Sequence, residues 1–446
     1  MNRWDLLKIF MKTKQVLKNA RWIIICKIVQ SVIQLVIGMI SARYLGPSNY
    51  GLINYAASIV AFLMPVMKLG LNATLVNELL DDRKKEGETI GTAITMNILS
   101  SLLCMVGVAA FCFMANPGET ETIIVCILYS TSIFFAALEM MQYWFQYKLL
   151  SKYSSLSMLG AYVVVSLYKV FLLVTGKSIY WFAVSHSIEY GIIGILLIVL
   201  YLKIGEQKFS FSWQAARRML DCSKHYIVSG LMVVIFQNTD HIMLTMMSGK
   251  AENGYYSAAI TCAGVAQFVY LAITDSFRPL ILAAKKEESS GYEYNLSRLY
   301  SIIIYLALAQ SVVFTLFAPL IIHILYGADY TASVSVLKIL VWYCAFSYMG
   351  TIRNIWILAE GKQKILPWIN LSGAVFNVLL NAVLIPFWGA CGAAFASLMT
   401  QIFANLILGF IIKPLRQNNR IMLKGINPRF FVTEIGKLID ELRKKE

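Results

Sequence analysis

Long apolar stretches follow one another along almost the whole of this chain, and only short polar connections separate them. Each stretch has about 20 residues or more, which is the helical length that crosses a hydrocarbon core about 30 Å thick. Hydrophobic residues make up 58% of the chain and charged residues only 14%, and no connection is long enough for a soluble catalytic domain. We therefore predict an all-α membrane protein with twelve transmembrane helices, at residues 22–45, 51–71, 90–114, 121–141, 154–175, 178–202, 226–248, 254–282, 299–325, 331–358, 366–387 and 389–412.

The 39 Lys and Arg residues are distributed unevenly around these stretches. Most lie in the N-terminal arm, in the connections after even-numbered helices and in the C-terminal tail. The positive-inside rule assigns such regions to the cytoplasm, so both termini are predicted to lie there. Because this bias accounts for most of the formal net charge of +15, the charge does not indicate a nucleic-acid partner.

The chain shows signs of an internal duplication. Gly46 and Gly51 lie between predicted helices one and two, and Gly249 and Gly254 lie between helices seven and eight with the same spacing. A unit of six helices repeated once keeps its orientation, so we predict two parallel-repeat six-helix bundles around a central cavity. The predicted parts are a cytoplasmic amphipathic arm at 1–21, the bundles at 22–205 and 226–412, an interfacial linker at 206–225 and a basic cytoplasmic tail at 413–446.

Polar side chains gather on single faces of several predicted helices. In helix two, Asn54, Ser58 and Lys68 belong to a series spaced by four and three residues, which confines them to an arc of about 80°. Small and hydroxyl residues on such a face are explained by helix packing alone, but charges are not, because a charge at membrane depth is costly. We therefore predict that the polar faces of helices one, two, seven and eight line the cavity, including Lys27, Gln34, Asn54, Lys68, Gln237, Asn238 and Asp240.

Motifs for catalysis are absent from the sequence. No G-x-x-x-x-G-K-[ST] phosphate loop occurs, the four His residues are widely spaced, and all Cys residues except Cys222 lie inside apolar stretches without a metal or redox spacing. These observations predict a transporter with a polar, partly cationic cavity rather than an enzyme. No cofactor and no structural metal are expected.

Four segments carry a resemblance to a known family. The first is SARYLGPSNYG at 41–51, and the others are 240–256, YGADY at 326–330, and 377–394 with its Leu-Ile-Pro and Gly-x-x-Gly sequences. Their order and spacing resemble the polysaccharide-type, Wzx-like flippases of the multidrug/oligosaccharidyl-lipid/polysaccharide (MOP) exporter superfamily, over about residues 15–412. The resemblance implies two bundles that alternate between inward-open and outward-open states. It implies that the protein moves an undecaprenyl-diphosphate-linked oligosaccharide repeat unit from the inner to the outer leaflet of the bacterial inner membrane for surface polysaccharide biosynthesis, beside polymerase and glycosyltransferase partners.

A diphosphate substrate agrees with the charges found in the helices, because Lys and Arg make charge-assisted hydrogen bonds to phosphate oxygens. Carboxylates in a low-dielectric site bind H⁺ or Na⁺, so acidic residues are candidates for ion coupling. The predicted roles are diphosphate binding by Lys27, Arg43, Lys68 and Arg278, of which Arg43 and Arg278 rest on motif position, sugar binding by Gln34, Asn54, Gln237 and Asn238, and coupling by Asp240 and Asp275.

Three other functions remain open. A lipid II flippase shares the superfamily and the diphosphate, and differs in carrying more cations along its first two helices. A cation-coupled multidrug antiporter needs an acidic cavity, which the Lys27 and Lys68 face argues against. A membrane-bound glycosyltransferase or polymerase needs an aqueous active-site loop, and the outer connections here are too short for one.

Overall fold

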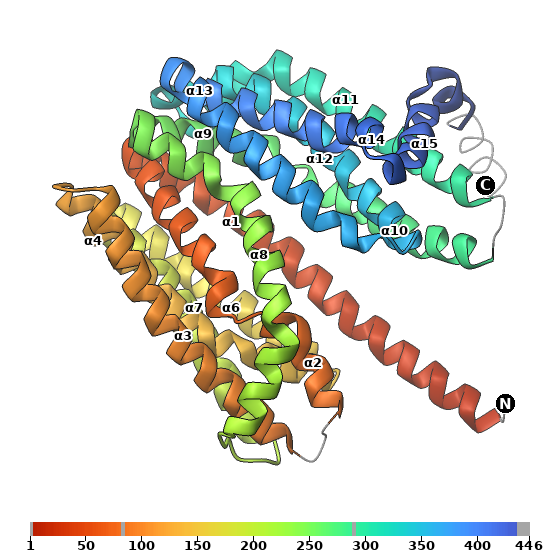
Figure 1. Cartoon of the computed structure of the whole chain (residues 1–446). Helices are drawn as coiled ribbons and strands as arrows, with labels where there is room; N and C mark the ends of the chain where they lie inside the picture. Colours follow the sequence, from red (N-terminus) through yellow and green to blue (C-terminus); the bar gives the residue numbers. More distant parts are fainter. Residues whose placement is uncertain (1–2, 82–84, 288–290, 435–446) are drawn as a thin grey trace. The chain divides into compact units, whose positions relative to one another are not determined.

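The computed structural model describes residues 3–81, 85–287 and 291–434, and this part of the chain contains helices and no β-strand (Figure 1). Residues 1–2 of the predicted arm and 435–446 of the predicted tail lie outside the described residues. Nine of the described helices are long and apolar enough to cross a membrane, or ten if one bent pair counts as a single span. The prediction of an all-α, multi-pass membrane protein is therefore confirmed, whereas the arrangement of twelve helices in two repeats stays a prediction.

The chain forms two compact units, Met1–Asn238 and Thr239–Glu446, and the boundary falls inside helix α8. The first unit contains α1 (Arg3–Met67), α2 (Leu71–Asp81), α3 (Glu86–Ala115), α4 (Thr120–Ala136), η2 (Ala137–Met141), α5 (Gln142–Tyr147), α6 (Ser151–Val174), α7 (Ile179–Ile204) and most of α8 (Trp213–Ser248). The second contains α9 (Lys250–Ala263), α10 (Gln267–Lys286), α11 (Gly291–Tyr326), η3 (Ala328–Tyr330), α12 (Ser333–Ala359), η4 (Gln363–Ile365), α13 (Leu366–Ile402), η5 (Phe403–Ile407), α14 (Leu408–Ile411), η6 (Lys413–Leu415) and α15 (Arg416–Ile426).

The number of predicted helices exceeds the number of observed spans by three. Two of these three are merged with a neighbour at a glycine kink, and the third corresponds to the bent pair α9–α10. Helix α1 runs through predicted helices one and two and breaks its helical geometry at Gly46 (φ 71, ψ 170). Helix α13 runs through predicted helices eleven and twelve and breaks at Gly389 (φ 51, ψ −129). Gly249, predicted as the repeat partner of Gly46, has φ 95 and ψ 170 and precedes α9. Positive φ favours glycine, so the repeated glycines occupy turns with closely similar backbone conformation.

Two interrupted helices are held by side chains from neighbouring helices. In the first unit, α1 ends at Met67 and α2 begins at Leu71. The carbonyl of Leu69, between them, accepts a hydrogen bond from Ser223 Oγ of α8 at 2.7 Å. In the second, α9 and α10 meet at a 45° bend, and Gln310 Nε2 of α11 donates to the carbonyl of Ala263 at 3.0 Å. Backbone groups freed inside a membrane need such partners. These contacts give a hydrogen-bond partner to one backbone carbonyl at each break.

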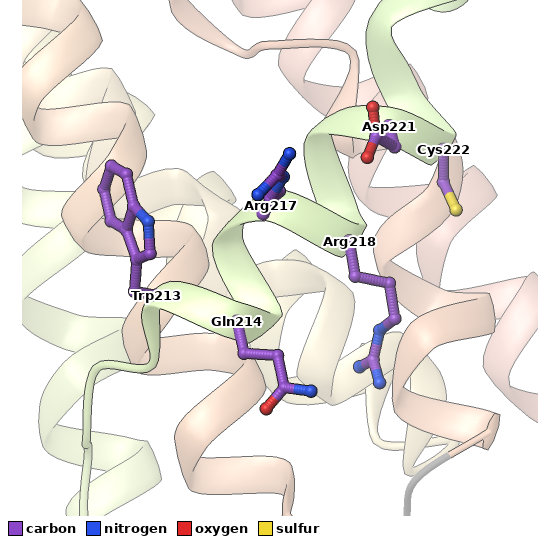
Figure 2. A pocket seen from close by; sticks show the side chains of 6 residues that line it. All are labelled: Trp213, Gln214, Arg217, Arg218, Asp221 and Cys222. Carbon is purple, nitrogen blue, oxygen red and sulfur yellow. The ribbon is translucent and has the colours of Figure 1, made fainter.

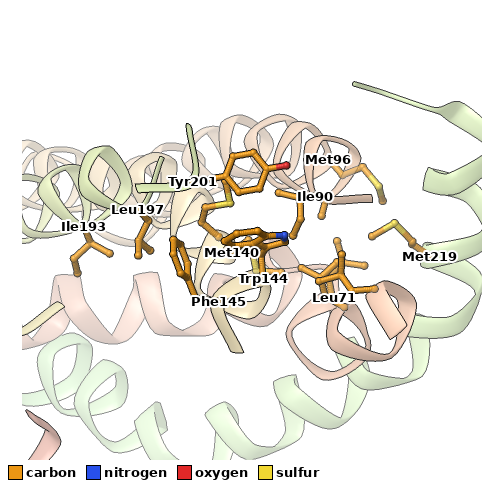
Figure 3. Close-up of a cluster of buried hydrophobic side chains, with 14 of the residues drawn as sticks. Leu71, Ile90, Met96, Met140, Trp144, Phe145, Ile193, Leu197, Tyr201 and Met219 are labelled. Atoms are coloured by element: carbon orange, nitrogen blue, oxygen red, sulfur yellow. The ribbon is translucent and has the colours of Figure 1, made fainter. Parts of the chain in front are cut away.

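A buried apolar cluster in the first unit centres on Trp144 (Figure 3). The Trp144 ring meets the rings of Phe145 and Tyr201 edge-on, with centroids 5.0 and 4.8 Å apart, and its Nε1 donates to Glu86 Oε2 at 3.0 Å. The ring is 2% exposed, so its polar N–H needs this partner. Side chains from α2, α3, α5, α6, α7 and α8 meet in this cluster, which joins most helices of the unit.

The connection between α7 and α8, predicted as an interfacial linker, packs on the first unit. The backbone N–H of Gly87 donates to Gln207 Oε1 at 2.9 Å, and the Phe209 ring stacks on Tyr201 at 4.6 Å. A Cβ on Gly91 would stand 3.3 Å from Cβ of Phe209 and closer still to the Ser210 backbone. The glycines of α3 therefore let this extended segment approach the helix closely.

In the second unit, a buried guanidinium holds the π-helical turn η5. Arg353 of α12 is 6% exposed and donates from Nη1 to the carbonyl of Ala404 at 2.7 Å and to Asn405 Oδ1 at 2.8 Å. A π-helical turn leaves backbone carbonyls without their usual helical donors, and a cationic donor is a strong replacement. Arg353 is therefore a buried structural donor within the second unit.

Candidate functional site

Three of the predicted substrate-binding residues lie on α1 before its kink. Lys27, Gln34 and Arg43 are all exposed in the structure. At about 100° per residue, Lys27 and Gln34 share one face of α1, but Arg43 lies about 180° around the helix from Gln34. The structure therefore supports a common face for Lys27 and Gln34 and places Arg43 on a different one.

Lys68 forms an ion pair with an acidic residue. Its Nζ lies 3.3 Å from Glu139 Oε2 of η2, and the two side chains are 22% and 17% exposed. Sequence reasoning proposed Lys68 for phosphate and left Glu139 outside the site. A phosphate at Lys68 has to compete with this carboxylate, because both are anions that bind the same ammonium.

Further charged residues of the first unit lie close to this pair. Glu189 of α7 interacts electrostatically with Glu139 and with Lys169 of α6. Its Oε2 lies 3.7 Å from His186 Nδ1, and the His186 ring packs against Tyr129 with centroids 4.8 Å apart. Residues 68, 139, 169, 186 and 189 thus form one partly buried network, called here the N-unit charge network. In this network Glu139 pairs with Lys68, while Lys169 faces the carboxylate of Glu189.

A second polar cluster surrounds Asp240 in the second unit. Asp240 is 6% exposed and accepts hydrogen bonds from Tyr256 Oη at 2.7 Å, from Asn381 Nδ2 at 2.6 Å and from Ser397 Oγ. All three donors are neutral, so these hydrogen bonds leave the negative charge of the carboxylate uncompensated. A buried carboxylate with only neutral donors around it is suited to the binding of a small cation.

Oxygen atoms suited to a hard cation lie around this carboxylate. Asn381 Nδ2 also contacts Asn377 Oδ1 at 3.0 Å, while Asn381 Oδ1 is buried and lacks a hydrogen-bond partner among the described residues. Carboxylate, amide and hydroxyl oxygens are ligands typical of such cations. Sequence reasoning identified Asp240 but missed Asn377, Asn381 and Ser397. The Asn-x-x-x-Asn spacing in α13 was the available signal, because residues four apart share a helix face. We call Asp240, Tyr256, Asn377, Asn381 and Ser397 the Asp240 cluster.

The other predicted residues make contacts of their own. Asp275 and Arg278 are neighbours on α10 and pair with each other, with Arg278 Nη2 3.2 Å from Asp275 Oδ1 and both side chains about half exposed. Asn54 of α1 donates to the carbonyl of Tyr50, and Asn238 of α8 donates to the carbonyl of Val234. Each of these hydrogen bonds lies within one helix. The convergence of these residues with Gln237 on one central cavity stays a prediction.

A hollow of about 710 Å³ lies on the first turns of α8, and its walls come from that helix (Figure 2). Arg218 there is held by Glu78 of α2, with Nε 3.1 Å from Oε2. The hollow contains no predicted substrate-binding or coupling residue; its lining is Trp213, Gln214, Arg217, Arg218, Asp221 and Cys222.

The fold belongs to a known class of membrane transporters. An inward-facing MATE family multidrug resistance transporter of the MOP superfamily has a TM-score of 0.69 at 14% identity, covering 89% of this chain and 96% of that chain. The lipid II flippase MurJ in an inward closed conformation has a TM-score of 0.73 at 15% identity, covering 93% and 92%. At these identities the similarity establishes the fold, which is that of MOP superfamily transporters.

The family follows from the sequence. The family model described as "polysaccharide biosynthesis protein" matches residues 16–282, which is more than half of the chain, and the chain belongs to this family. A capsular polysaccharide biosynthesis protein, CapF of Staphylococcus aureus, is 20% identical over 89% of this chain and 99% of its own length. A protein named as a putative O-antigen transporter of Escherichia coli K12 is 21% identical over 85% and 92%. The predicted relationship to Wzx-like flippases and the prediction of a transporter rather than an enzyme are confirmed.

Proposed function

We propose that this chain is a flippase that moves an undecaprenyl-diphosphate-linked oligosaccharide repeat unit from the inner to the outer leaflet by alternating access. The observation that carries the proposal is membership of the polysaccharide biosynthesis family on a MOP transporter fold. The names of the capsule and O-antigen relatives support the substrate class. The bacterial inner membrane, cytoplasmic termini and a neighbouring polymerase and glycosyltransferases belong to the same proposal.

The diphosphate of this substrate is anionic and cannot cross hydrocarbon unaided. Lys27, Arg43, Lys68 and Arg278 provide cations for it, and two of them already hold a carboxylate, Lys68 with Glu139 and Arg278 with Asp275. A phosphate oxygen that replaces such a carboxylate exchanges one anion for another. Exchange costs less than bringing an unpaired charge into the membrane, because the lysine or arginine stays paired throughout.

Sugar hydroxyls are assigned to the amide side chains. Asn54 and Asn238 each use Nδ2 in a bond to a helix carbonyl, at 2.8 and 3.2 Å. An amide group has two N–H donors and an acceptor oxygen, so each keeps hydrogen-bonding capacity for a ligand. Gln34 and Gln237, both exposed, complete the proposed sugar-binding set.

The Asp240 cluster is the proposed coupling site for H⁺ or Na⁺. A bound cation would neutralise a carboxylate whose three hydrogen-bond donors are neutral, and the unpartnered Asn381 oxygen would provide a further ligand. Asp275 was the second candidate from sequence. Its carboxylate is exposed and paired with Arg278, so Asp240 is the stronger candidate.

Lipid II is the alternative substrate, and the similarity to the MurJ fold favours it among the other candidates. Both cargoes carry a polyprenyl diphosphate, so the cationic residues suit either. A multidrug antiporter is disfavoured by Lys27 and Lys68 on the polar faces of α1 and the turn that follows it.

Complementation tests the proposal. The chain is expressed in bacteria that lack their own repeat-unit flippase and, separately, in cells depleted of their lipid II flippase, and surface polysaccharide and growth are scored. Restored surface polysaccharide, lost in Lys68→Ala and Arg43→Ala variants of equal expression, is the expected result. Rescue of the lipid II strain alone would overturn the oligosaccharide assignment in favour of the alternative.

A further inference from the structure

Helix α15 lies directly after the last candidate membrane span of the chain. That span ends at Ile411, and α15 begins at Arg416 after the short turn η6. The helix has 11 residues and contains no Asp or Glu. Its position and composition place a basic helix at the point where the chain leaves the membrane.

One face of α15 is fixed to the second unit. Tyr300 Oη of α11 donates to Asn418 Oδ1 at 2.9 Å, and Asn419 Nδ2 donates to the carbonyl of Leu406 at 2.9 Å. At the last residue of the helix, Tyr305 Oη donates to the carbonyl of Ile426 at 2.8 Å. These bonds involve both ends of the helix, so α15 is oriented by the fold rather than free to turn.

The same contacts require small residues at the interface. A Cβ on Gly425 would stand 2.7 Å from the carbonyl oxygen of Ser297 and 2.8 Å from Cβ of Tyr300. Close packing of this kind fixes which residues of α15 face inward. The buried residues are Asn418, Asn419, Ile421, Met422 and Gly425.

The opposite face carries the positive charges. Arg416, Arg420 and Lys424 follow one another at four-residue spacing, and all three are exposed. At about 100° per residue they share an arc of about 100° with Leu423, which is 48% exposed. The fold thus presents a fixed row of three cations with an apolar side chain beside it. We call these four residues the α15 basic row.

Acidic residues nearby are engaged elsewhere. Glu434 accepts hydrogen bonds from Tyr294 and lies 3.3 Å from Nε of Arg298, and it is buried. Glu293 accepts a hydrogen bond from Gln417 at 3.2 Å. Neither carboxylate pairs with the α15 basic row in these contacts, so the row keeps a positive potential.

We propose that the α15 basic row binds the head groups of anionic phospholipids, with Leu423 inserted at the boundary of the acyl chains. A helix with cations and an apolar residue on one face, next to the end of a membrane span, is complementary to an anionic bilayer surface. Because the inner face is fixed to α11 and to the carbonyl of Leu406, this contact anchors the second unit at the membrane surface. The inference is independent of which substrate the protein transports.

An environment-sensitive fluorophore at position 423 tests the contact. The full chain with Cys222→Ser and Leu423→Cys is labelled with NBD and reconstituted into phosphatidylcholine vesicles with or without phosphatidylglycerol. We expect a blue-shifted, brighter emission only with phosphatidylglycerol, and a return toward the phosphatidylcholine value in 1 M salt, where the Debye length is about 3 Å.

Two charge variants of the labelled protein complete the test. Arg416→Gln with Arg420→Gln and Lys424→Gln should lose the phosphatidylglycerol effect, whereas Arg416→Lys with Arg420→Lys should keep it. Equal emission in both lipids, or an unchanged effect in the neutral variant, would overturn the proposal. If the neutral variant does not fold, the lipid comparison and the salt series on the labelled parent decide together. A contact with an acidic protein surface would weaken in salt but would not depend on phosphatidylglycerol.

Discussion

The ion pair of Lys68 with Glu139 is compatible with two roles for Lys68. The lysine either binds the substrate or is the counter-ion of a structural carboxylate. The paired atoms are 3.3 Å apart and both side chains are mostly buried. Removing one partner of such a pair leaves the other charge uncompensated at membrane depth, which lowers activity without any role in binding. A single substitution therefore does not distinguish the two roles.

The double variant Lys68→Met with Glu139→Gln does distinguish them. Each single variant should be destabilised, but by less than the loss of about 3–5 kcal/mol that is typical of fully buried pairs. The double variant should regain most of that loss. Thermal unfolding in detergent measures stability, and complementation measures transport. Regained stability without regained transport is the result expected of a substrate ligand. Recovery of both would identify Lys68 as a structural partner of Glu139.

Asp240 is the residue on which the coupling proposal depends. Asp240→Asn removes the charge and preserves the shape, and it replaces one of the two acceptor oxygens with an NH2 donor. That donor can face another donor, Asn381 Nδ2, which is 2.6 Å from Asp240 Oδ1 in the parent. An unsatisfied buried donor costs about 1–3 kcal/mol, so a modest loss of stability is expected. The informative measurement is transport in vesicles with an imposed Na⁺ or pH gradient. The parent should respond to one gradient and Asp240→Asn to neither. A gradient response retained by the variant would exclude this site as the coupling site.

At the scale of helices, a carboxylate joins the ends of three elements in the second unit. Glu360, just after α12, accepts hydrogen bonds from Lys285 Nζ of α10 at 2.6 Å and from Tyr292 Oη of α11 at 3.0 Å. Burial alone would raise the pKa of Glu360, but the bonds from Lys285 and Tyr292 outweigh it and hold the pKa below its usual value. The first unit contains a similar group, in which Glu86 accepts from Lys148 and Tyr147.

This group predicts a pH dependence of stability. A lowered carboxylate pKa stabilises the fold at pH values above the unfolded pKa of about 4.3, and the contribution is lost as pH falls through the folded value. We expect Glu360→Gln to cost about 1 kcal/mol at pH 7, since Lys285 is partly exposed, and the difference from the parent to shrink as pH falls below about 4.3. Thermal midpoints across about pH 3–7 measure both effects. A constant difference over this range would contradict the assignment.

At the scale of the whole molecule, the distribution of Lys and Arg predicts cytoplasmic termini and twelve crossings. Green fluorescent protein fused after Glu446 should fluoresce, because it folds in the cytoplasm. A fusion after Gly327, between predicted helices nine and ten, should be dark. Bright fluorescence from both fusions would show that predicted helices ten to twelve do not cross the membrane three times. Such a result would revise the number of crossings, but not the helices themselves.

Hydropathy and helical periodicity determined much of this protein from sequence alone. They predicted apolar helices, because membrane insertion depends on local length and polarity, and they found Asp240 and the glycines at which helices turn. The motif resemblance identified the family. Periodicity also placed Lys27 with Gln34 on one face of α1.

Only the tertiary structure decided which polar groups meet. Lys68 and Glu139 are 71 residues apart, and Asp240 is 141 residues from Asn381 and 157 from Ser397. Periodicity assigns a residue to a face of its own helix, but partners on other helices depend on packing, which no local pattern encodes. For the same reason, no local pattern indicates that packing buries Arg353 beside η5. The charges of the site could thus be predicted, and their pairing could not.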